Sequence, residues 1–250
     1  MNGEINFDRV LLKERAKEII KEDYWKCFLA ALVLSFALNG SDILKIDHTV
    51  EVASGGFAAQ LFYNHSILGA LFFLPILIFF ALLGSAVVLV IGKLIEAPLE
   101  VSGKRFFLEA SQRRFDLGNL GFGFTGNFFN VFKTILIRDV FVFLWGLLLI
   151  IPGIVKHYSY SMVSSILAEN PDMDYKRALK LSEDMTNGFK MDLFVMDLSF
   201  LGWLFLGALL FGIGTFFVLP YIDAANTEAY LFLRARALDL GIVNIRELSR

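Results

Sequence analysis

The chain of 250 residues contains a single cysteine, Cys27, and only three histidines. One cysteine excludes an intramolecular disulfide and any metal site built from several thiolates. The histidines, His48, His65 and His157, are widely separated and belong to no HExxH motif and to no Ser-His-Asp order. We therefore expect no enzymatic activity, no bound metal and no cofactor.

An excess of charge of one sign is also missing, because 23 basic residues face 25 acidic ones and the net charge is -2. A chain without a basic excess has no electrostatic basis for binding nucleic acid, and we expect no such partner. Apolar residues instead make up 56% of the sequence, and 27 of them are phenylalanine. Soluble domains contain about 45–50% apolar residues, and a soluble core could not bury this surplus. An integral membrane protein is therefore predicted.

Six apolar segments are predicted to cross the membrane, since a helix needs about 20 mainly apolar residues to span the hydrocarbon core. They are residues 24–39, 67–95, 134–151, 154–168, 191–211 and 215–233. The fourth segment is short and carries several polar side chains, so neighbouring helices must shelter it. The predicted fold is all-α: a polytopic transmembrane helical bundle with amphipathic interfacial helices, formed by one integral membrane domain, residues 1–250.

The segments between the spans differ in charge, and this difference predicts their orientation. Residues 40–66 hold few basic side chains and are predicted to form an outer loop. Residues 96–133 and 169–190 are rich in lysine and arginine and are predicted to be cytoplasmic loops. Residues 1–23 have the pattern of an amphipathic cytoplasmic helix that lies in the headgroup plane. Both termini are therefore expected in the cytoplasm.

Basic side chains on the expected cytoplasmic face form a polybasic surface. They are Lys13, Lys17, Lys21, Arg113, Arg114, Lys176, Arg177 and Lys180. The predicted orientation alone accounts for these residues, and contact with anionic lipids is their functional extension.

The segment from Leu147 to Arg236 is the one around which the remaining chain is organised. Two apolar runs each break at a glycine-centred turn, at Pro152-Gly153 and at Gly212–Gly214, and each resumes as a helix with polar residues. A charged amphipathic stretch, residues 172–190, joins them and is too polar to enter hydrocarbon. This pattern predicts a pair of transmembrane hairpins.

Charged side chains inside the predicted spans are costly in a bilayer, so each is a candidate for a functional site. The candidates for an intramembrane polar site are Arg138, Lys156, Glu169, Asp197, Asp223 and Glu228. At about 1.5 Å per residue from each turn, four of them are predicted to lie in one layer near the cytoplasmic side. These four are Arg138, Glu169, Asp197 and Glu228.

Two interpretations of these charges follow. In the first, Asp197, Asp223 and Glu228 form a site for a cation or a proton. In the second, the acids pair with basic side chains such as Arg138, Lys156 and Arg234 and so fix the register of the helices.

The stretch LWGLLLIIPGIVKHYSYSMVSSILAENP, followed by MDLSFLGW, GIG and LPY, resembles the DUF975 family of uncharacterised bacterial integral membrane proteins. The matching positions are Pro152, Gly153, Lys156, Tyr158, Ser159, Tyr160, Asp197, Ser199, Phe200, Gly202, Trp203, Gly212, Gly214, Pro220 and Tyr221. The resemblance implies a bacterial cytoplasmic membrane. It implies no activity, since the family has no established one.

Two functions are therefore considered for the chain. The first is a non-catalytic, multi-pass membrane protein that acts in interaction or assembly, or that handles a lipid or a peptide. Its expected partners are membrane lipids, other membrane proteins or further copies of the same chain. The alternative is a small transporter or channel subunit that uses the intramembrane acids.

Overall fold

The structure is a computed structural model that describes residues 8–31, 67–209 and 213–248. Every regular element in these ranges is a helix, which confirms the predicted all-α class. Two helices are long and apolar enough to cross a membrane, Pro75–Ser111 and Lys190–Leu209, so the six-span bundle is not confirmed. The predicted outer loop, residues 40–66, lies outside the described residues, as do Gly212 and residues 32–39, the second half of the first predicted span.

The described helices follow one another with short connections. They are α1 (Arg9–Glu22), α5 (Ile67–Ser111), the 3-10 helix η2 (Leu117–Gly121), α6 (Phe122–Thr125), α7 (Phe128–Leu148), α8 (Ile150–Ser159), α9 (Val163–Glu169), α10 (Tyr175–Met185), α11 (Lys190–Leu209), α12 (Ile213–Asp239) and α13 (Ile245–Leu248). Residues 24–31 are also helical. Aspartates start two of the polar helices, because the carboxylates of Asp8 and Asp174 accept hydrogen bonds from N–H groups of the first turns of α1 and α10.

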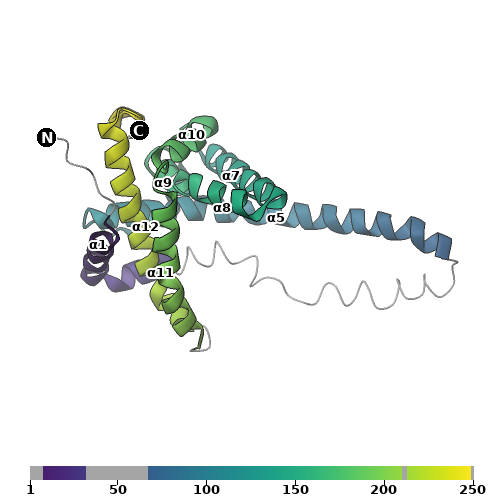
Figure 1. Ribbon diagram of the computed structural model, residues 1–250, viewed down its shortest axis with the longest axis horizontal. Coiled ribbons are helices and arrows are strands. Elements are labelled where there is room, and N and C mark those ends of the chain that lie inside the picture. Colours follow the sequence, from purple (N-terminus) through teal and green to yellow (C-terminus); the bar gives the residue numbers. More distant parts are fainter. Residues whose placement is uncertain (1–7, 32–66, 210–212, 249–250) are drawn as a thin grey trace.

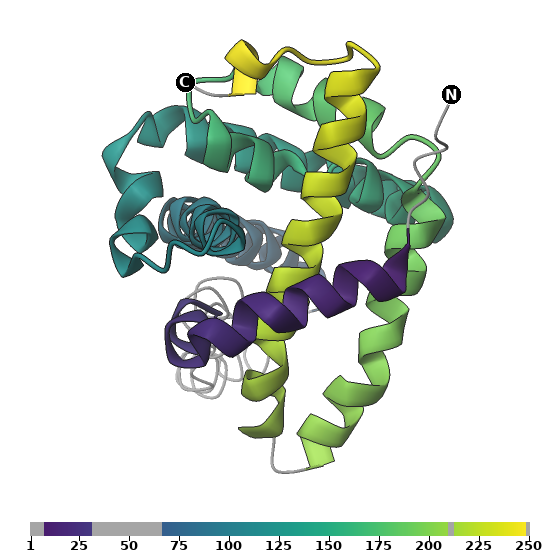
Figure 2. The same ribbon diagram turned by 90° about the vertical axis from the view of Figure 1, so that its left-hand side faces the viewer.

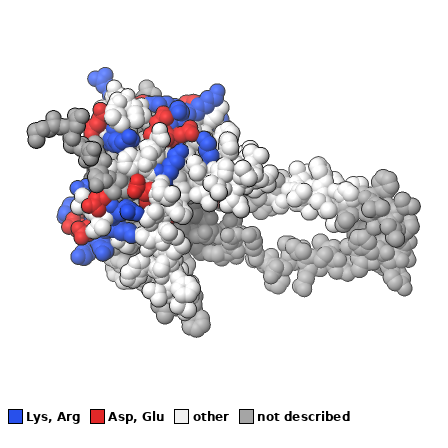
Figure 3. All heavy atoms as spheres, in the orientation of Figure 1, with Lys and Arg blue, Asp and Glu red and all other residues white. Residues whose placement is uncertain are grey.

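Charged side chains gather on one part of the molecule, which we call the charged body, and apolar segments project from it (Figures 1 and 3). The longest projection is the N-terminal part of α5, where Val88 is 69% exposed. The tips of the α7–α8 and α11–α12 hairpins are equally apolar, with Ile150 76% exposed and Phe205 68% exposed. Water-soluble monomers rarely expose contiguous apolar surface on this scale.

The core lies within the charged body and is centred on α9. Residues 163–168 of α9 are all buried. The C-terminal half of α5 packs against this helix and contributes Phe106 and Phe107, while Tyr230 of α12 is fully buried. Helix α10 covers α9 with the face that contains Leu181 and Met185.

Helix α1 lies across α12 near its middle (Figure 2). The buried residues Leu12, Ala16 and Ile19 recur at helical spacing and form the face of α1 that packs on the protein. This amphipathic pattern agrees with the helix predicted for residues 1–23, of which the structure describes residues 8–23.

The α7–α8 hairpin turns at Leu149, which is extended with φ -157° and ψ 140°. The sequence predicted the break at Pro152-Gly153, whereas Pro152 lies in the first turn of α8. Proline is tolerated there because the first N–H groups of a helix have no intrahelical acceptor. Gly153 is required for another reason: a Cβ atom on it would lie 2.6 Å from Gly146 Cα on the facing helix.

The α11–α12 hairpin repeats this glycine contact. A Cβ atom on Gly214 would lie 2.7 Å from Gly207 Cα, and one on Gly207 would lie 2.6 Å from the backbone nitrogen of Thr215. Each hairpin therefore needs glycine next to its tip so that two backbones can approach closely.

Two predicted boundaries differ from the observed helices. The second span was predicted to end at Ile95, but α5 continues to Ser111 as one helix. Charged pairs along the helix accompany this extension, with Lys93 Nζ 2.5 Å from Glu96 Oε1 and Arg105 2.9 Å from Glu109 Oε1. The predicted span 154–168 is divided between α8 and α9 by a turn at residues 160–162. At about 1.5 Å per residue, the 10 residues of α8 cover only half of a bilayer core.

Candidate functional site

A half-open cleft of about 630 Å³ lies between α5, α7, the α8–α9 segment, α11 and α12. It is lined by Lys93, Glu100, Lys104, Arg138, Asp139, Val142, Phe143, His157, Tyr158, Tyr160, Ser161, Met162, Ser164, Ser165, Leu193, Asp197 and Asn226. The lining contains three cations, Lys93, Lys104 and Arg138, and three acids, Glu100, Asp139 and Asp197. The formal charge of the lining is therefore balanced when His157 is neutral.

The centre of the lining is an ion-pair network around Arg138 of α7. Its guanidinium donates to both carboxylate oxygens of Glu100 of α5, at 2.6 and 2.9 Å. It also donates from Nε to Asp139 Oδ1 at 2.8 Å. Glu100 is only 6% exposed, so the bidentate geometry compensates the cost of removing both charges from water.

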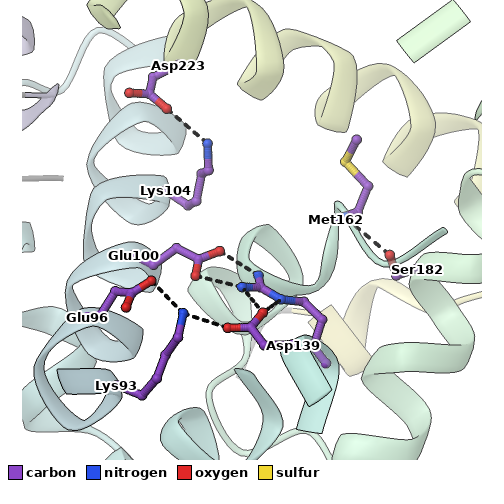
Figure 4. Close-up of polar contacts among 9 residues, drawn as sticks. Lys93, Glu96, Glu100, Lys104, Asp139, Met162, Ser182 and Asp223 are labelled. Atoms are coloured by element: carbon purple, nitrogen blue, oxygen red, sulfur yellow. Dashed lines mark hydrogen bonds and ion pairs between the residues drawn. The ribbon is translucent and has the colours of Figure 1, made fainter. Parts of the chain in front are cut away.

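Lys93 extends this network along α5. Its ammonium lies 2.5 Å from Glu96 Oε1 and 2.7 Å from Asp139 Oδ2 (Figure 4). Because Glu96 and Glu100 belong to α5 and Asp139 belongs to α7, the network ties these two helices together at the mouth of the α7–α8 hairpin.

A second ion pair connects α5 with α12. Lys104 Nζ donates to Asp223 Oδ1 at 3.0 Å, and both side chains are mostly buried (Figure 4). One turn further along α12, Asn226 faces the same cleft. The pair therefore fixes the α12 wall relative to the α5 wall.

On the side of the cleft formed by α8 and α11, the two helices are joined by a hydrogen bond from an uncharged side chain. Tyr158 donates from its hydroxyl to Asp197 Oδ2 at 3.0 Å, and His157 packs edge-on against the Tyr158 ring. Among the residues that the structure describes, Asp197 has no basic side chain within ion-pair distance. Asp197 is thus the acid of the cleft whose hydrogen-bond partner carries no positive charge.

Two of the predicted site residues form ion pairs outside the cleft. Lys156 Nζ lies 2.8 Å from Glu183 Oε1 of α10, and this hydrogen bond holds the pKa of Glu183 below its usual value. Glu169 accepts from Arg234 Nε at 2.8 Å and from the hydroxyl of Tyr230 at 3.0 Å. These contacts link α8 to α10 and α9 to α12.

Glu228 lies on another face of α12. It is 7% exposed, and the nearby cation that acts on it is Arg15 of α1. No ion pair within 4 Å joins Glu228 to another described residue. The structure therefore does not bring Arg138, Glu169, Asp197 and Glu228 into one layer: Arg138 and Asp197 line the cleft, whereas Glu169 and Glu228 lie elsewhere.

Asp139, which lines the cleft next to Arg138, was not among the predicted site residues. Four charged residues of α5 were missed as well, namely Lys93, Glu96, Glu100 and Lys104. They were placed at or beyond the end of a span, although successive members are three or four residues apart. This spacing puts all four on one face of a helix and was the signal that could have identified them.

Several positions of the predicted motif have direct structural contacts. Tyr158 and Tyr160 line the cleft, and the carbonyl oxygen of Ser159 accepts from Ser182 Oγ at 2.8 Å. Phe200 and Tyr221 pack edge-to-face with their centroids 5.3 Å apart, joining α11 to α12. Within the described residues, no group of three His, Cys, Asp or Glu side chains could hold a metal ion.

Residues 147–237 match the model of a family described as "Protein of unknown function (DUF975)". The matched segment begins in the tip of the α7–α8 hairpin and ends near the end of α12, so it contains α8 to α11 and the α8, α11 and α12 walls of the cleft. This match confirms the resemblance to DUF975 over residues 147–237. Comparisons with curated proteins and with solved structures gave no match.

Proposed function

We propose that this protein is a non-catalytic, multi-pass component of the bacterial cytoplasmic membrane whose cleft receives the polar part of a membrane amphiphile, a lipid headgroup or a peptide segment. The single observation that carries the proposal is the charge-balanced cleft, because it opens beside helices whose projecting parts expose mainly apolar side chains. A ligand with one polar and one apolar part fits both surfaces.

The membrane location is supported by the distribution of charge. The projecting part of α5 and the two hairpin tips lack charged side chains, whereas α1, α10 and the end of α12 carry many (Figure 3). Because α1 and the C-terminal end of α12 both belong to the charged body, both termini lie on the same side in this proposal. That side is the cytoplasm, since basic residues are retained there.

The pairing of the charges supports binding over transport. Asp223 is neutralised by Lys104, and Glu228 lies outside the cleft, so the three acids of the transporter hypothesis do not converge. Breaking a buried ion pair by removing one partner costs about 3–5 kcal/mol, which makes these pairs unsuitable as exchangeable ion sites. Asp197 is the exception and keeps transport as the second candidate.

The proposal is tested with a phospholipid that carries a photoactivatable diazirine in its headgroup. The full-length protein is reconstituted in liposomes that contain this lipid, irradiated, digested and analysed by mass spectrometry. We expect crosslinks in peptides from residues 157–165. Ser161→Trp, which fills the cleft, is expected to reduce them several-fold.

The matched control is Ser111→Trp. Ser111 and Ser161 each donate a hydroxyl to a carbonyl three residues earlier, at 2.7 and 2.9 Å, but Ser111 lies at the end of α5 and does not line the cleft. Equal crosslinking in both variants would overturn the proposed lipid-headgroup occupancy. Proton or cation flux into the same liposomes that Asp197→Asn abolishes would favour the transporter instead.

A further inference from the structure

Four basic residues of α1 follow one another at intervals of four positions: Arg9, Lys13, Lys17 and Lys21. Side chains four residues apart are neighbours on a helix, so these residues form a continuous cationic row along α1. Arg9, Lys17 and Lys21 are exposed and Lys13 is half-buried. Among the described residues, none of the four forms an ion pair within 4 Å.

The cationic row borders the face of α1 that packs on the α11–α12 hairpin. Lys13 donates to Ser199 Oγ, and its ammonium lies 4.5 Å from the centre of the Phe200 ring. Lys17 lies 5.9 Å from the centre of the Tyr221 ring. The ammonium groups of Lys13 and Lys17 therefore lie against aromatic rings of the hairpin, and these contacts attach the cationic row to α11 and α12.

The position of α1 along the hairpin agrees with such an interface. Figure 2 shows α1 crossing the hairpin between its apolar tip and the part of α12 that enters the charged body. Leu201 and Phe205, between Phe200 and the tip, are 55% and 68% exposed. On the opposite side of Phe200, α11 carries Asp197 and Asp192.

An aromatic cluster in the helical segment after α1, residues 24–31, lies next to α12 as well. Trp25 is 69% exposed and packs against Tyr24 and Phe28, and Phe28 stacks on Phe217 of α12 at 5.4 Å. Tryptophan and tyrosine favour the headgroup layer because their rings are amphipathic. Charge and aromatic content thus place α1 at the same depth.

The like charges of the row repel one another. Burial and the neighbouring Arg9 and Lys17 lower the pKa of Lys13. A phosphate group at the row would remove this repulsion, since it presents a negative charge and several acceptor oxygens.

From this arrangement we infer that the cationic row of α1 is a binding surface for the headgroup phosphates of anionic phospholipids. The ligand of this surface is the anionic leaflet of the membrane. Helix α1 lies in the headgroup layer, and Lys13 and Lys17 contact both the lipid phosphates and the α11–α12 hairpin. Each basic residue near an anionic surface contributes about 1 kcal/mol of attraction, so a row of four gives a strong preference for anionic over zwitterionic lipid.

This inference rests on the proposed membrane location but not on the cleft. It is tested by native mass spectrometry of the full-length protein released from detergent after incubation with equal amounts of phosphatidylglycerol and phosphatidylcholine. We expect the native chain to retain phosphatidylglycerol in at least tenfold excess, and Lys13→Gln/Lys17→Gln/Lys21→Gln to lose most of that excess.

The matched control removes three positive charges outside the polybasic surface, in Lys133→Gln/Lys190→Gln/Arg246→Gln, and is expected to retain the excess. Because Lys13 also contacts Ser199 and Phe200, the variant Lys17→Gln/Lys21→Gln is measured as well and should lose part of the excess while its unfolding temperature stays unchanged. No preference in the native chain, or equal loss in row and control variants, would overturn the inference. Competition by inorganic phosphate or by RNA that displaces the lipid equally well would overturn the assignment to a lipid surface.

Extraction of the membranes with carbonate separates this failure from a failure of the proposed function. Native protein that stays in the membrane but shows no lipid preference contradicts only the cationic row. Native protein that is released contradicts the membrane location as well.

Discussion

Replacement of Gly153 by alanine is expected to destabilise the α7–α8 hairpin, although alanine normally favours helices. A Cβ atom there would lie 2.6 Å from Gly146 Cα and 3.0 Å from Gly146 N, both backbone atoms. Ordinary contact begins at 3.4 Å, so the helices must separate by several tenths of an ångström. Overpacking of this kind costs about 1–3 kcal/mol.

The facing residue provides the control. A Cβ atom on Gly146 would meet nothing within 4 Å, so Gly146→Ala lacks the clash and keeps the gain of about 0.5–1 kcal/mol that alanine has over glycine inside a helix. The two substitutions therefore differ by about 1.5–4 kcal/mol in unfolding free energy.

Thermal unfolding of both variants in the same detergent measures this difference. About 2–4 °C per kcal/mol is expected for a chain of this size, so Gly153→Ala should melt well below Gly146→Ala. Equal melting temperatures, or a lower one for Gly146→Ala, would refute the close helix contact.

Two further predictions concern ion pairs. Arg138→Gln should destabilise the fold by about 3–5 kcal/mol, because it leaves Glu100 buried without its partner. The double substitution Arg138→Gln/Glu100→Gln should cost less free energy than the sum of the two single substitutions. Additive effects in chemical unfolding would contradict the ion pair. Glu247 accepts from Arg177 at 2.6 Å, which lowers the pKa of Glu247 below its ordinary value of 4.5. A lowered folded-state pKa stabilises the attachment of α13 above pH 4.5 and loses this effect as the pH falls through the folded-state value. The protection of residues 242–248 against hydrogen exchange, measured relative to the intrinsic exchange rate at each pH, should therefore fall as the pH drops below 4.5 in the native chain. In Glu247→Gln the protection should be low both above and below this pH.

The sequence predicted those features that depend on composition and local pattern. The apolar runs and the glycines at positions 153 and 214 predict the helical class and the two hairpins, and the spacing of apolar residues predicts the amphipathic α1. The turn at Leu149 was not predictable, since an extended leucine has no local signature. Its position depends on where Gly146 and Gly153 let the helices cross.

The composition of the cleft depended on contacts between distant segments. In the sequence, Glu96 and Glu100 resemble the polar end of a span. Their place in the cleft could not be predicted, because Glu100 pairs with Arg138 on another helix. Asp223 and Glu228 lie five residues apart, yet one faces Lys104 and the other faces α1. The direction of a side chain around its helix cannot be assigned until the neighbouring helices are known, and this is why only Arg138 and Asp197 of the six candidates line the cleft.

The proposed membrane location is the basis of both proposed binding surfaces, and site-directed spin labelling in liposomes measures it directly. In a Cys27→Ala background, nitroxides at Leu147→Cys on the apolar tip and at Lys176→Cys on the charged body are compared for collision with oxygen and with a water-soluble nickel complex. The Leu147 label should be reached by oxygen and shielded from nickel, and the Lys176 label should show the reverse. Equal access of nickel to both labels would contradict the proposed insertion of the hairpin into the bilayer.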